Sequence, residues 1–324
     1  MKASLSRILE HNGILVIDGS MSTALERMGA ALNDSLWTAR VLADRPELIR
    51  QVHMEYFRAG ADCGITCSYQ ATIPGLMNCG YTKVEAEALI RRSVELFLGA
   101  RDRWWAEEGA AAGREYPLCL AGAGPYGAYL ADGSEFTGDY DVSDQALYDF
   151  HARRLELLLE AGADLLLLET QPSLREAVIA ARIAEELGAD YWVSFSCRDR
   201  SRTNRGELIR DCARELSGGF PHLRMIGVNC TKPEFVVSLI EEMKSETALP
   251  IAVYPNSGMD YDPAAKTWAG RGDTDFAHYA LSYMTAGAVA VGGCCTTAQE
   301  QIRQVVQARE LFLASGRPKS VRPF

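Results

Sequence analysis

The sequence predicts an α/β fold, a (β/α)8 barrel of the TIM type that forms a single domain over residues 1–324. Short aliphatic runs alternate about eight times with segments in which apolar residues recur every three or four positions. No Pro/Ser-rich linker or block of charge divides the chain, which favours one domain. A doubly wound open sheet is the alternative for the same alternation.

The predicted strands are short, continuous and aliphatic, a pattern typical of parallel strands that are covered on both faces. In chain order they are Ile14–Asp18, Cys63–Cys67, Leu118–Gly122, Leu165–Glu169, Trp192–Ser196, Arg224–Val228, Ile251–Tyr254 and Val289–Gly292.

The predicted helices lie between these strands. A repeated phrase, of which Ala59-Gly60-Ala61-Asp62 is the first copy, ends a helix and leads into the next strand. Glycine supplies the left-handed residue that ends a helix at such a turn. The helices expected from the three-to-four spacing include Pro46–Ala59, Val84–Trp105, Asp144–Ala161, Leu174–Leu187, Pro233–Met243 and Ala298–Leu313.

The composition is that of an acidic globular protein. Lys and Arg number 33 against 43 Asp and Glu, so the formal net charge is −10. This balance argues against nucleic-acid binding, which needs a basic surface. No apolar run approaches the ~20 residues that span a bilayer, and the first residues do not resemble a signal peptide. We therefore expect a cytoplasmic protein without nucleic-acid or membrane partners, whose nine cysteines are free or bind metal.

Three cysteines fall where such barrels carry their chemistry, at the carboxyl ends of strands. Cys230 follows the strand Arg224–Val228, and Cys294 and Cys295 follow Val289–Gly292. One strand separates these two, so their ends can converge over the barrel mouth. Three thiolates there would suit Zn²⁺ and leave a fourth position open, as in catalytic zinc sites. Spacing alone leaves two other interpretations, ordinary buried thiols or a redox-active adjacent pair.

Four motifs at strand ends resemble the homocysteine S-methyltransferase family, over a span from about Ile14 to Arg309. The resemblance implies a barrel enzyme with Zn²⁺ as cofactor, in which zinc-bound homocysteine thiolate accepts a methyl group and becomes methionine. In that family the last two motifs carry the zinc ligands, which here are Cys230, Cys294 and Cys295. The four motifs are Asp18-Gly19-Ser20-Met21, the TCSYQAT segment from Thr66 to Thr72, Gly227-Val228-Asn229-Cys230 and Gly292-Gly293-Cys294-Cys295.

The loop sequences, in particular residues 124–135, resemble the branch of the family that uses S-methylmethionine as methyl donor. S-adenosylmethionine is a second candidate donor. Betaine- and selenocysteine-type methyltransferases of the same family are alternative functions. From a different class, the alternative is a redox sensor built on Cys294 and Cys295, which would not need a clamp for an amino acid.

The resemblance also implies which residues contact homocysteine. Asp18 and Glu169 match positions that hold its amino group, and carboxylates are suitable partners for ammonium. Thr66 matches a neighbouring position, and Asn229, which precedes a zinc ligand, is expected to hydrogen-bond a ligand or the substrate. Three of these have a structural alternative: a helix N-cap for Asp18, a plain strand residue for Thr66, and closure of a βα turn for Asn229.

Two predicted βα loops, residues 124–142 and 255–276, are unusually long. The first combines aromatic rings with carboxylates, which together suit a sulfonium cation. The second is expected to cover the pocket. A solvated acidic loop and a structural excursion are the respective alternatives.

Overall fold

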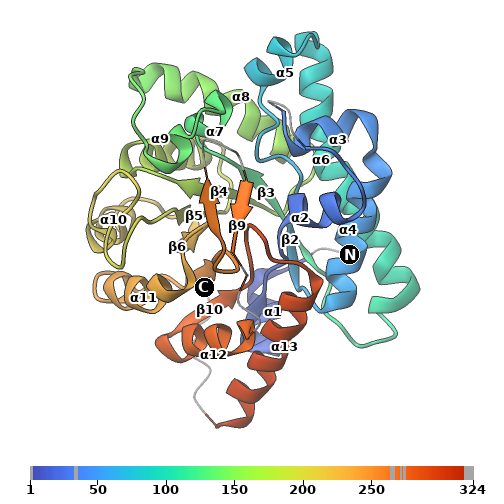
Figure 1. Ribbon diagram of the computed structural model, residues 1–324, viewed down its shortest axis with the longest axis vertical. Coiled ribbons are helices and arrows are strands. Elements are labelled where there is room, and N and C mark those ends of the chain that lie inside the picture. The colour runs from blue at the N-terminus through green and yellow to red at the C-terminus, as the bar shows by residue number, and fades with distance from the viewer. Residues whose placement is uncertain (1–2, 33–35, 263–266, 271, 273–274, 317–324) are drawn as a thin grey trace.

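The computed structural model describes residues 3–32, 36–262, 267–270, 272 and 275–316. Its centre is a parallel eight-stranded sheet with the order β1-β10-β7-β6-β5-β4-β3-β2. A parallel bridge between Ile17 and Cys63 joins the two ends of this order, so the sheet closes into a barrel. Figure 1 looks onto the ring of strands, with the helices arranged around its outside. The predicted (β/α)8 barrel is confirmed, and the open sheet is wrong.

Every predicted strand overlaps a strand of the barrel. An antiparallel pair, β8 (Asp260–Asp262) and β9 (Thr267–Ala269), follows β7 and was not predicted. The barrel strands are β1 (Leu15–Val16), β2 (Cys63–Ile65), β3 (Leu118–Ala123), β4 (Leu165–Gln171), β5 (Tyr191–Phe195), β6 (Leu223–Asn229), β7 (Ile251–Tyr254) and β10 (Ala288–Val291).

At least one helix follows each barrel strand, and the six predicted helices correspond to α4, α6, α8, α9, α11 and α13. The helices are α1 (Leu5–Asn12), α2 (Met21–Arg27), α3 (Thr38–Asp44), α4 (Pro46–Ala59), α5 (Ile73–Asn78), α6 (Lys83–Trp104), α7 (Tyr126–Leu130), α8 (Asp144–Glu160), α9 (Leu174–Glu186), α10 (Ile209–Leu216), α11 (Val236–Lys244), α12 (Phe276–Ala286) and α13 (Gln299–Ala314). In the described part of the chain, no helix is both long and apolar enough to cross a membrane.

The core has two parts, one inside the barrel and one between the barrel and its helices. On β4, Leu165 and Leu167 belong to the inner cluster, whereas Leu166 and Leu168 belong to the outer one. Successive side chains of a strand point to opposite faces. Because both faces of each strand are buried, the sequence of β4 is a continuous aliphatic run instead of an alternating one.

Helix α1 closes the amino-terminal mouth of the barrel. Its buried side chains Leu5, Ile8 and Leu9 join the inner cluster, together with Leu118 at the start of β3. Apolar side chains of the described residues pack this end of the barrel. In barrels of this kind the functional site lies at the carboxyl ends of the strands.

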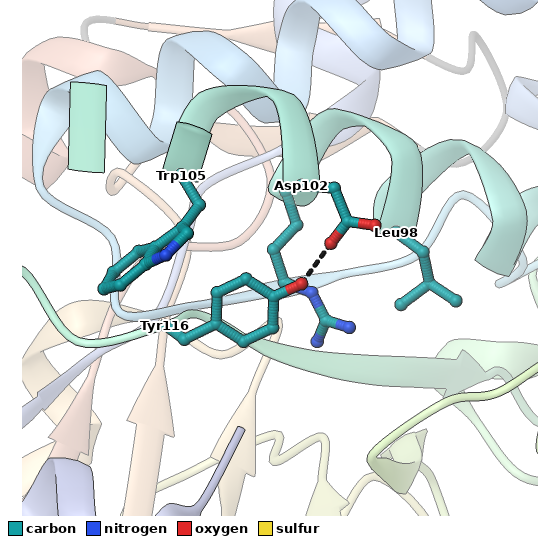
Figure 2. A pocket seen from close by; sticks show the side chains of 5 residues that line it. Leu98, Asp102, Trp105 and Tyr116 are labelled. Atoms are coloured by element: carbon teal, nitrogen blue, oxygen red, sulfur yellow. Dashed lines mark hydrogen bonds between the residues drawn. The ribbon is translucent and has the colours of Figure 1, made fainter. Parts of the chain in front are cut away.

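A surface hollow of about 490 Å³ lies between α6 and the start of β3 (Figure 2). The Tyr116 hydroxyl donates a hydrogen bond to Asp102 across it. Arg101 pairs with Asp164 at 2.5 Å and donates to the carbonyl of Pro117 at 3.1 Å. The charged groups of the hollow are thus bonded to other parts of the protein, and these bonds hold α6 against the barrel.

Gly227 on β6 marks a place where the barrel admits no side chain. A Cβ atom there would lie 2.7 Å from the backbone carbonyl carbon of Ala252 on β7 and closer still to its oxygen. Backbone atoms of a paired strand cannot move aside cheaply. Gly99, on the exposed face of α6, is the opposite case, because a Cβ atom there would meet nothing within 4 Å.

We predict opposite effects for the same substitution at these two glycines. Gly227→Ala should lower the free energy of unfolding by about 2 to 3 kcal/mol through overpacking. Gly99→Ala should raise it by about 0.5 to 1 kcal/mol through helix propensity. Denaturant unfolding of the two variants measures both. Equal stability of Gly227→Ala and the wild type would contradict the described pairing of β6 with β7.

Candidate functional site

The structure brings Cys230, Cys294 and Cys295 together at the carboxyl end of the barrel. Their three Sγ atoms all lie within 4.8 Å of one another. The Sγ of Cys230 is 3.2 Å from that of Cys294 and 3.4 Å from that of Cys295. All three are free thiols and partly buried. This is the convergence that was expected from two strands separated by β7.

Local backbone geometry places these thiols. Cys230 directly follows β6 with a positive φ of 49°, so the chain turns sharply at the cysteine itself. Gly292, at the end of β10, lets the chain approach β1, because a Cβ there would lie 2.6 Å from the Cβ of Ile17. The backbone N–H of Cys294 then donates to the carbonyl of Pro255 at 2.7 Å. The sulfurs are thus held by main-chain constraints from β1, β6, β7 and β10.

The three thiols share their protons. Hydrogen bonds with Cys230 and Cys295 hold the pKa of Cys294 well below the ordinary thiol value, and contact with Asn229 lowers it further. The hydrogen bond to Cys294 raises the pKa of Cys230 well above that value. A negative charge on Cys294 would therefore be stabilised by the two thiols beside it. Three sulfur donors at this spacing fit a soft divalent cation such as Zn²⁺, which would replace the shared protons.

Two buried carboxyl groups accompany the thiols. The Asp18 Oδ2 atom accepts a hydrogen bond from the backbone N–H of Ile65 at 3.0 Å, whereas Oδ1 is buried without a partner among the described residues. Burial raises the pKa of both Asp18 and Glu169 well above the usual range, and the charge of Cys294 raises both further. A cationic ligand would relieve both effects. The N-cap alternative for Asp18 is wrong, since Ser20 caps α2 by accepting from the N–H of Thr23.

Thr66 and Asn229 both make hydrogen bonds to residues of other strands, Thr66 to β3 and Asn229 to β4. The Thr66 hydroxyl lies 2.6 Å from the Ser68 hydroxyl and accepts from the backbone N–H of Gly122 at 3.2 Å. The Asn229 amide accepts from the N–H of Thr170 at 2.9 Å and donates to its hydroxyl at 2.8 Å. The same Asn229 nitrogen lies 3.8 Å from the Sγ of Cys294. Asn229 therefore joins the carboxyl end of β6 to that of β4 and also contacts a thiol of the cluster.

Arg154 is a residue of this region that was not predicted from the sequence. It is fully buried on α8 and donates to the backbone carbonyls of Gly124 at 3.0 Å, Ser68 at 2.8 Å and Tyr69 at 2.6 Å. The loops after β2 and β3 are thus fixed to each other. The sequence did contain a signal, because Arg154 lies on the buried stripe of α8 three residues after His151. A charge on such a stripe needs a partner.

The long loop after β3 is anchored by a second buried group, Glu176 on α9. Its carboxyl group accepts from the backbone N–H of Tyr126 at 2.6 Å and from the hydroxyl of Tyr140. It also lies 2.8 Å from Nε2 of His151. Burial raises the pKa of Glu176 to about 8. Burial, together with the charge of Arg154, lowers the pKa of His151 to about 3.

The second long loop, residues 255–276, is described only in part, because residues 263–266, 271, 273 and 274 lie outside the described residues. The described part contains the hairpin of β8 and β9, which is drawn in front of the ring of strands in Figure 1. Its role as a cover of the pocket stays a prediction.

The barrel and the thiol cluster define a class of protein, a (β/α)8 barrel with a candidate metal site of three cysteines. The family model described as homocysteine S-methyltransferase matches residues 15–309. The chain belongs to the homocysteine S-methyltransferase family.

Several known proteins are similar to this chain over most of its length. Homocysteine S-methyltransferase YbgG of Bacillus subtilis is 45% identical over 93% of this chain and 96% of its own. The selenocysteine methyltransferase of Astragalus bisulcatus is 41% identical over 93% of both chains. The metallated form of the homocysteine methyltransferase MmuM from Escherichia coli superposes with a TM-score of 0.83 at 41% identity, covering 92% of this chain and 97% of that one.

Removal of one thiol is expected to weaken metal binding. Cys295→Ser should weaken zinc affinity by at least about tenfold, the loss that even an outer-shell contact can cause. Cys79→Ser, the same change outside the cluster, should leave metal content at the wild-type level. Metal analysis of purified protein and competition with a chromophoric chelator measure both. Unchanged zinc affinity in Cys295→Ser would contradict the assignment.

The anchor of the loop after β3 predicts a pH dependence of stability. The native carboxyl group of Glu176 binds its proton more tightly than the ordinary value of 4.5, so stability is lost as pH rises toward about 8. His151 has the opposite effect, because its native imidazole binds a proton less tightly than the ordinary value of 6.5. Its contribution to stability is therefore lost as pH falls from 6.5 toward about 3.

Glu176→Gln should therefore flatten the alkaline side of the stability profile. Between pH 5 and 9 the wild type should lose on the order of 2 kcal/mol of unfolding free energy that the variant retains. On the acid side, the stability profile of Glu176→Gln should keep the slope of the wild-type profile. Glu186→Gln, on the exposed face of the same helix, serves as the control. Parallel profiles for Glu176→Gln and the wild type would mean that Glu176 is ionised in the native protein.

Proposed function

We propose that the protein is a zinc-dependent homocysteine S-methyltransferase that uses S-methylmethionine as methyl donor and forms methionine. The observation that carries this proposal is the thiol cluster of Cys230, Cys294 and Cys295 beside the buried carboxyl groups of Asp18 and Glu169. Thiols alone suit many metal proteins. Thiols near buried carboxyl groups, one of which has an oxygen without a partner among the described residues, suit an amino acid that carries both an ammonium group and a sulfur atom.

The donor set fits zinc better than other common divalent ions. Thiolate is a soft ligand, and three of them at one point favour Zn²⁺ over the oxygen-preferring Mg²⁺ or Ca²⁺. Three protein ligands leave a position for a substrate sulfur. When bound, the ion would lower the pKa of a substrate thiol, so that the acceptor is a thiolate at neutral pH.

The carboxyl groups would hold the amino end of homocysteine. The Oδ1 atom of Asp18 is buried with no partner among the described residues, so an ammonium N–H would satisfy it. An ammonium charge would also offset the mutual repulsion among Asp18, Glu169 and Cys294 that raises both carboxyl pKa values beyond the effect of burial. Asn229 would keep Cys294 in place through its contact with the sulfur. Thr66 keeps one acceptor lone pair for the substrate beyond its two bonds.

The reaction needs positioning more than proton transfer. The acceptor thiolate attacks the methyl carbon of the sulfonium donor, a new S–C bond forms, and the old S–C bond breaks. The electron pair of the broken bond stays on the donor sulfur, which becomes a neutral thioether. No proton moves at the methyl carbon, so the site requires no general base there. Its residues orient the two sulfur atoms on either side of the methyl group.

The rival from another class, a redox sensor built on Cys294 and Cys295, explains the sulfurs but not the carboxyl groups. A disulfide switch has no use for buried acids that destabilise the protein when empty. A selenol acceptor is a variant of the same function, since one relative is named a selenocysteine methyltransferase. It enters as a separate arm of the test.

The decisive measurement is methionine formation from homocysteine, with S-methylmethionine, S-adenosylmethionine and betaine as donors in parallel. We expect turnover with S-methylmethionine that a chelator reduces at least tenfold and added zinc restores. Selenocysteine replaces homocysteine in the acceptor arm. Turnover with betaine alone would overturn the donor assignment. Absence of turnover with every donor, in protein that contains zinc, would overturn the proposed function.

A further inference from the structure

Glu135 is an acidic residue near the thiol cluster that the proposed reaction does not yet use. It belongs to the short helical turn Ser134–Phe136 in the loop after β3. Gly127 on α7 lets this turn fold back, because a Cβ there would lie 2.7 Å from the carbonyl carbon of Ser134 and 2.9 Å from the Cα of Glu135. The carboxylate then accepts a hydrogen bond from the hydroxyl of Tyr69 at 3.0 Å.

Tyr69 is itself held in place from several sides. Its backbone carbonyl accepts from the buried guanidinium of Arg154 at 2.6 Å. Its ring lies against Gly124, where a Cβ would come within 2.7 Å of Cε2, and packs edge-on to Trp37 with the ring centroids 6.1 Å apart. The loops after β2 and β3 therefore position the Tyr69 hydroxyl together, and the hydroxyl positions Glu135.

The pair of Tyr69 and Glu135 is linked to the thiol cluster through Thr170. The Tyr69 phenol bonds to the Thr170 side chain. The Thr170 hydroxyl accepts from the Asn229 amide at 2.8 Å, and that amide nitrogen lies 3.8 Å from the Sγ of Cys294. Burial raises the pKa of the Tyr69 phenol, and the charges of Glu135, Cys230 and Glu169 each raise it further. At Cys295, the hydrogen bond from Cys230 lowers the pKa, but the bond to Cys294, burial and the charges of Cys294 and Glu135 together raise it well above the ordinary value. Glu135 is therefore close enough to Cys295 for its charge to act on that sulfur.

We propose that Glu135, oriented by Tyr69, is the counter-charge that binds the sulfonium group of the methyl donor. This inference rests on the proposed function and names the residue that recognises the donor's permanent positive charge. The acceptor and the donor would then approach from opposite sides, with the ammonium of homocysteine on Asp18 and Glu169 and the sulfonium beside Glu135. The tyrosine ring adds an aromatic surface of the kind on which onium groups bind.

The chemistry predicts a particular kinetic effect. The donor is cationic before transfer, and its sulfur is neutral afterwards, so the positive charge diminishes as the transition state forms. A carboxylate beside that sulfur stabilises the bound donor more than the transition state, and it therefore lowers the KM of the donor without raising kcat. It also binds methionine, the neutral product, less well than the cationic donor, which favours product release.

Glu135→Gln tests the charge with little change of shape. We expect the KM for S-methylmethionine to rise about tenfold, the effect of one lost charge-assisted contact. The value of kcat should hold or rise slightly, and the KM for homocysteine and the zinc content should stay within about twofold of the wild type. Tyr69→Phe should change donor KM in the same direction by a smaller factor, because the carboxylate remains but loses its positioning bond.

The matched control is Asp132→Asn, which removes the same charge from the same loop. Asp132 is exposed, and its carboxylate accepts from the N–H of Ser134 at 2.9 Å and from the Ser134 hydroxyl. The asparagine oxygen can keep both bonds. Donor KM in this variant should equal that of the wild type, which separates a local effect of Glu135 from the overall charge of the loop.

Inhibition by methionine, measured against the donor at saturating homocysteine, distinguishes charge recognition from loop structure. Methionine differs from S-methylmethionine by one methyl group and one positive charge. If Glu135 binds the sulfonium, Glu135→Gln weakens the binding of the donor but not the binding of methionine. Equal weakening of both would overturn the inference, because the residue would then support the loop or bind the amino group. Unchanged donor KM would also overturn it while the proposed function stood, whereas absence of wild-type turnover would refute the function itself.

Discussion

Like charges confined to one small volume at the carboxyl end of the barrel determine what this site can bind. Three sulfur atoms lie within 4.8 Å of one another, and the buried carboxyl groups of Asp18 and Glu169 feel the charge of Cys294. Charge removed from water costs free energy unless opposite charge or hydrogen-bond donors offset it. The buried cation nearby, Arg154, directs its hydrogen bonds to backbone carbonyls. Ligands have to supply the remaining compensation, and a metal ion, an ammonium group and a sulfonium group each do so.

Close approach of backbones makes this concentration of charge possible. A Cβ at Gly64 would lie 2.8 Å from the Asp18 carboxylate, and one at Gly122 would collide with that of Glu169. At Gly292 it would meet Ile17, where the last strand closes against the first. Gly292 therefore lets the barrel close, and Gly64 and Gly122 leave room for its acidic groups. A substitution at Gly292 would disturb closure, and one at Gly64 or Gly122 would displace a carboxyl group.

The sequence predicted the barrel and the meeting of the three cysteines because both follow from strand order. Each strand is an aliphatic run, and residues at strand ends must converge once the sheet closes. Contacts between loops do not follow from periodicity. The bond from Tyr69 to Glu135 joins residues 66 positions apart, and the link from Arg154 to Ser68 joins residues 86 apart. The hairpin of β8 and β9 was missed for a related reason, since it is an antiparallel insertion in a loop outside the βα repeat.

The charge balance of the proposed reaction also determines which ligands the pocket binds in preference. Before transfer the pocket holds the ammonium of the acceptor and the sulfonium of the donor against its own thiolates and carboxylates. Transfer unites a thiolate with a methyl group that leaves a sulfonium, so one negative and one positive charge disappear together. The thioether products no longer carry the sulfur charges through which both substrates were held. A pocket rich in negative charge therefore binds a new sulfonium donor in preference to the neutral thioether that it has just formed.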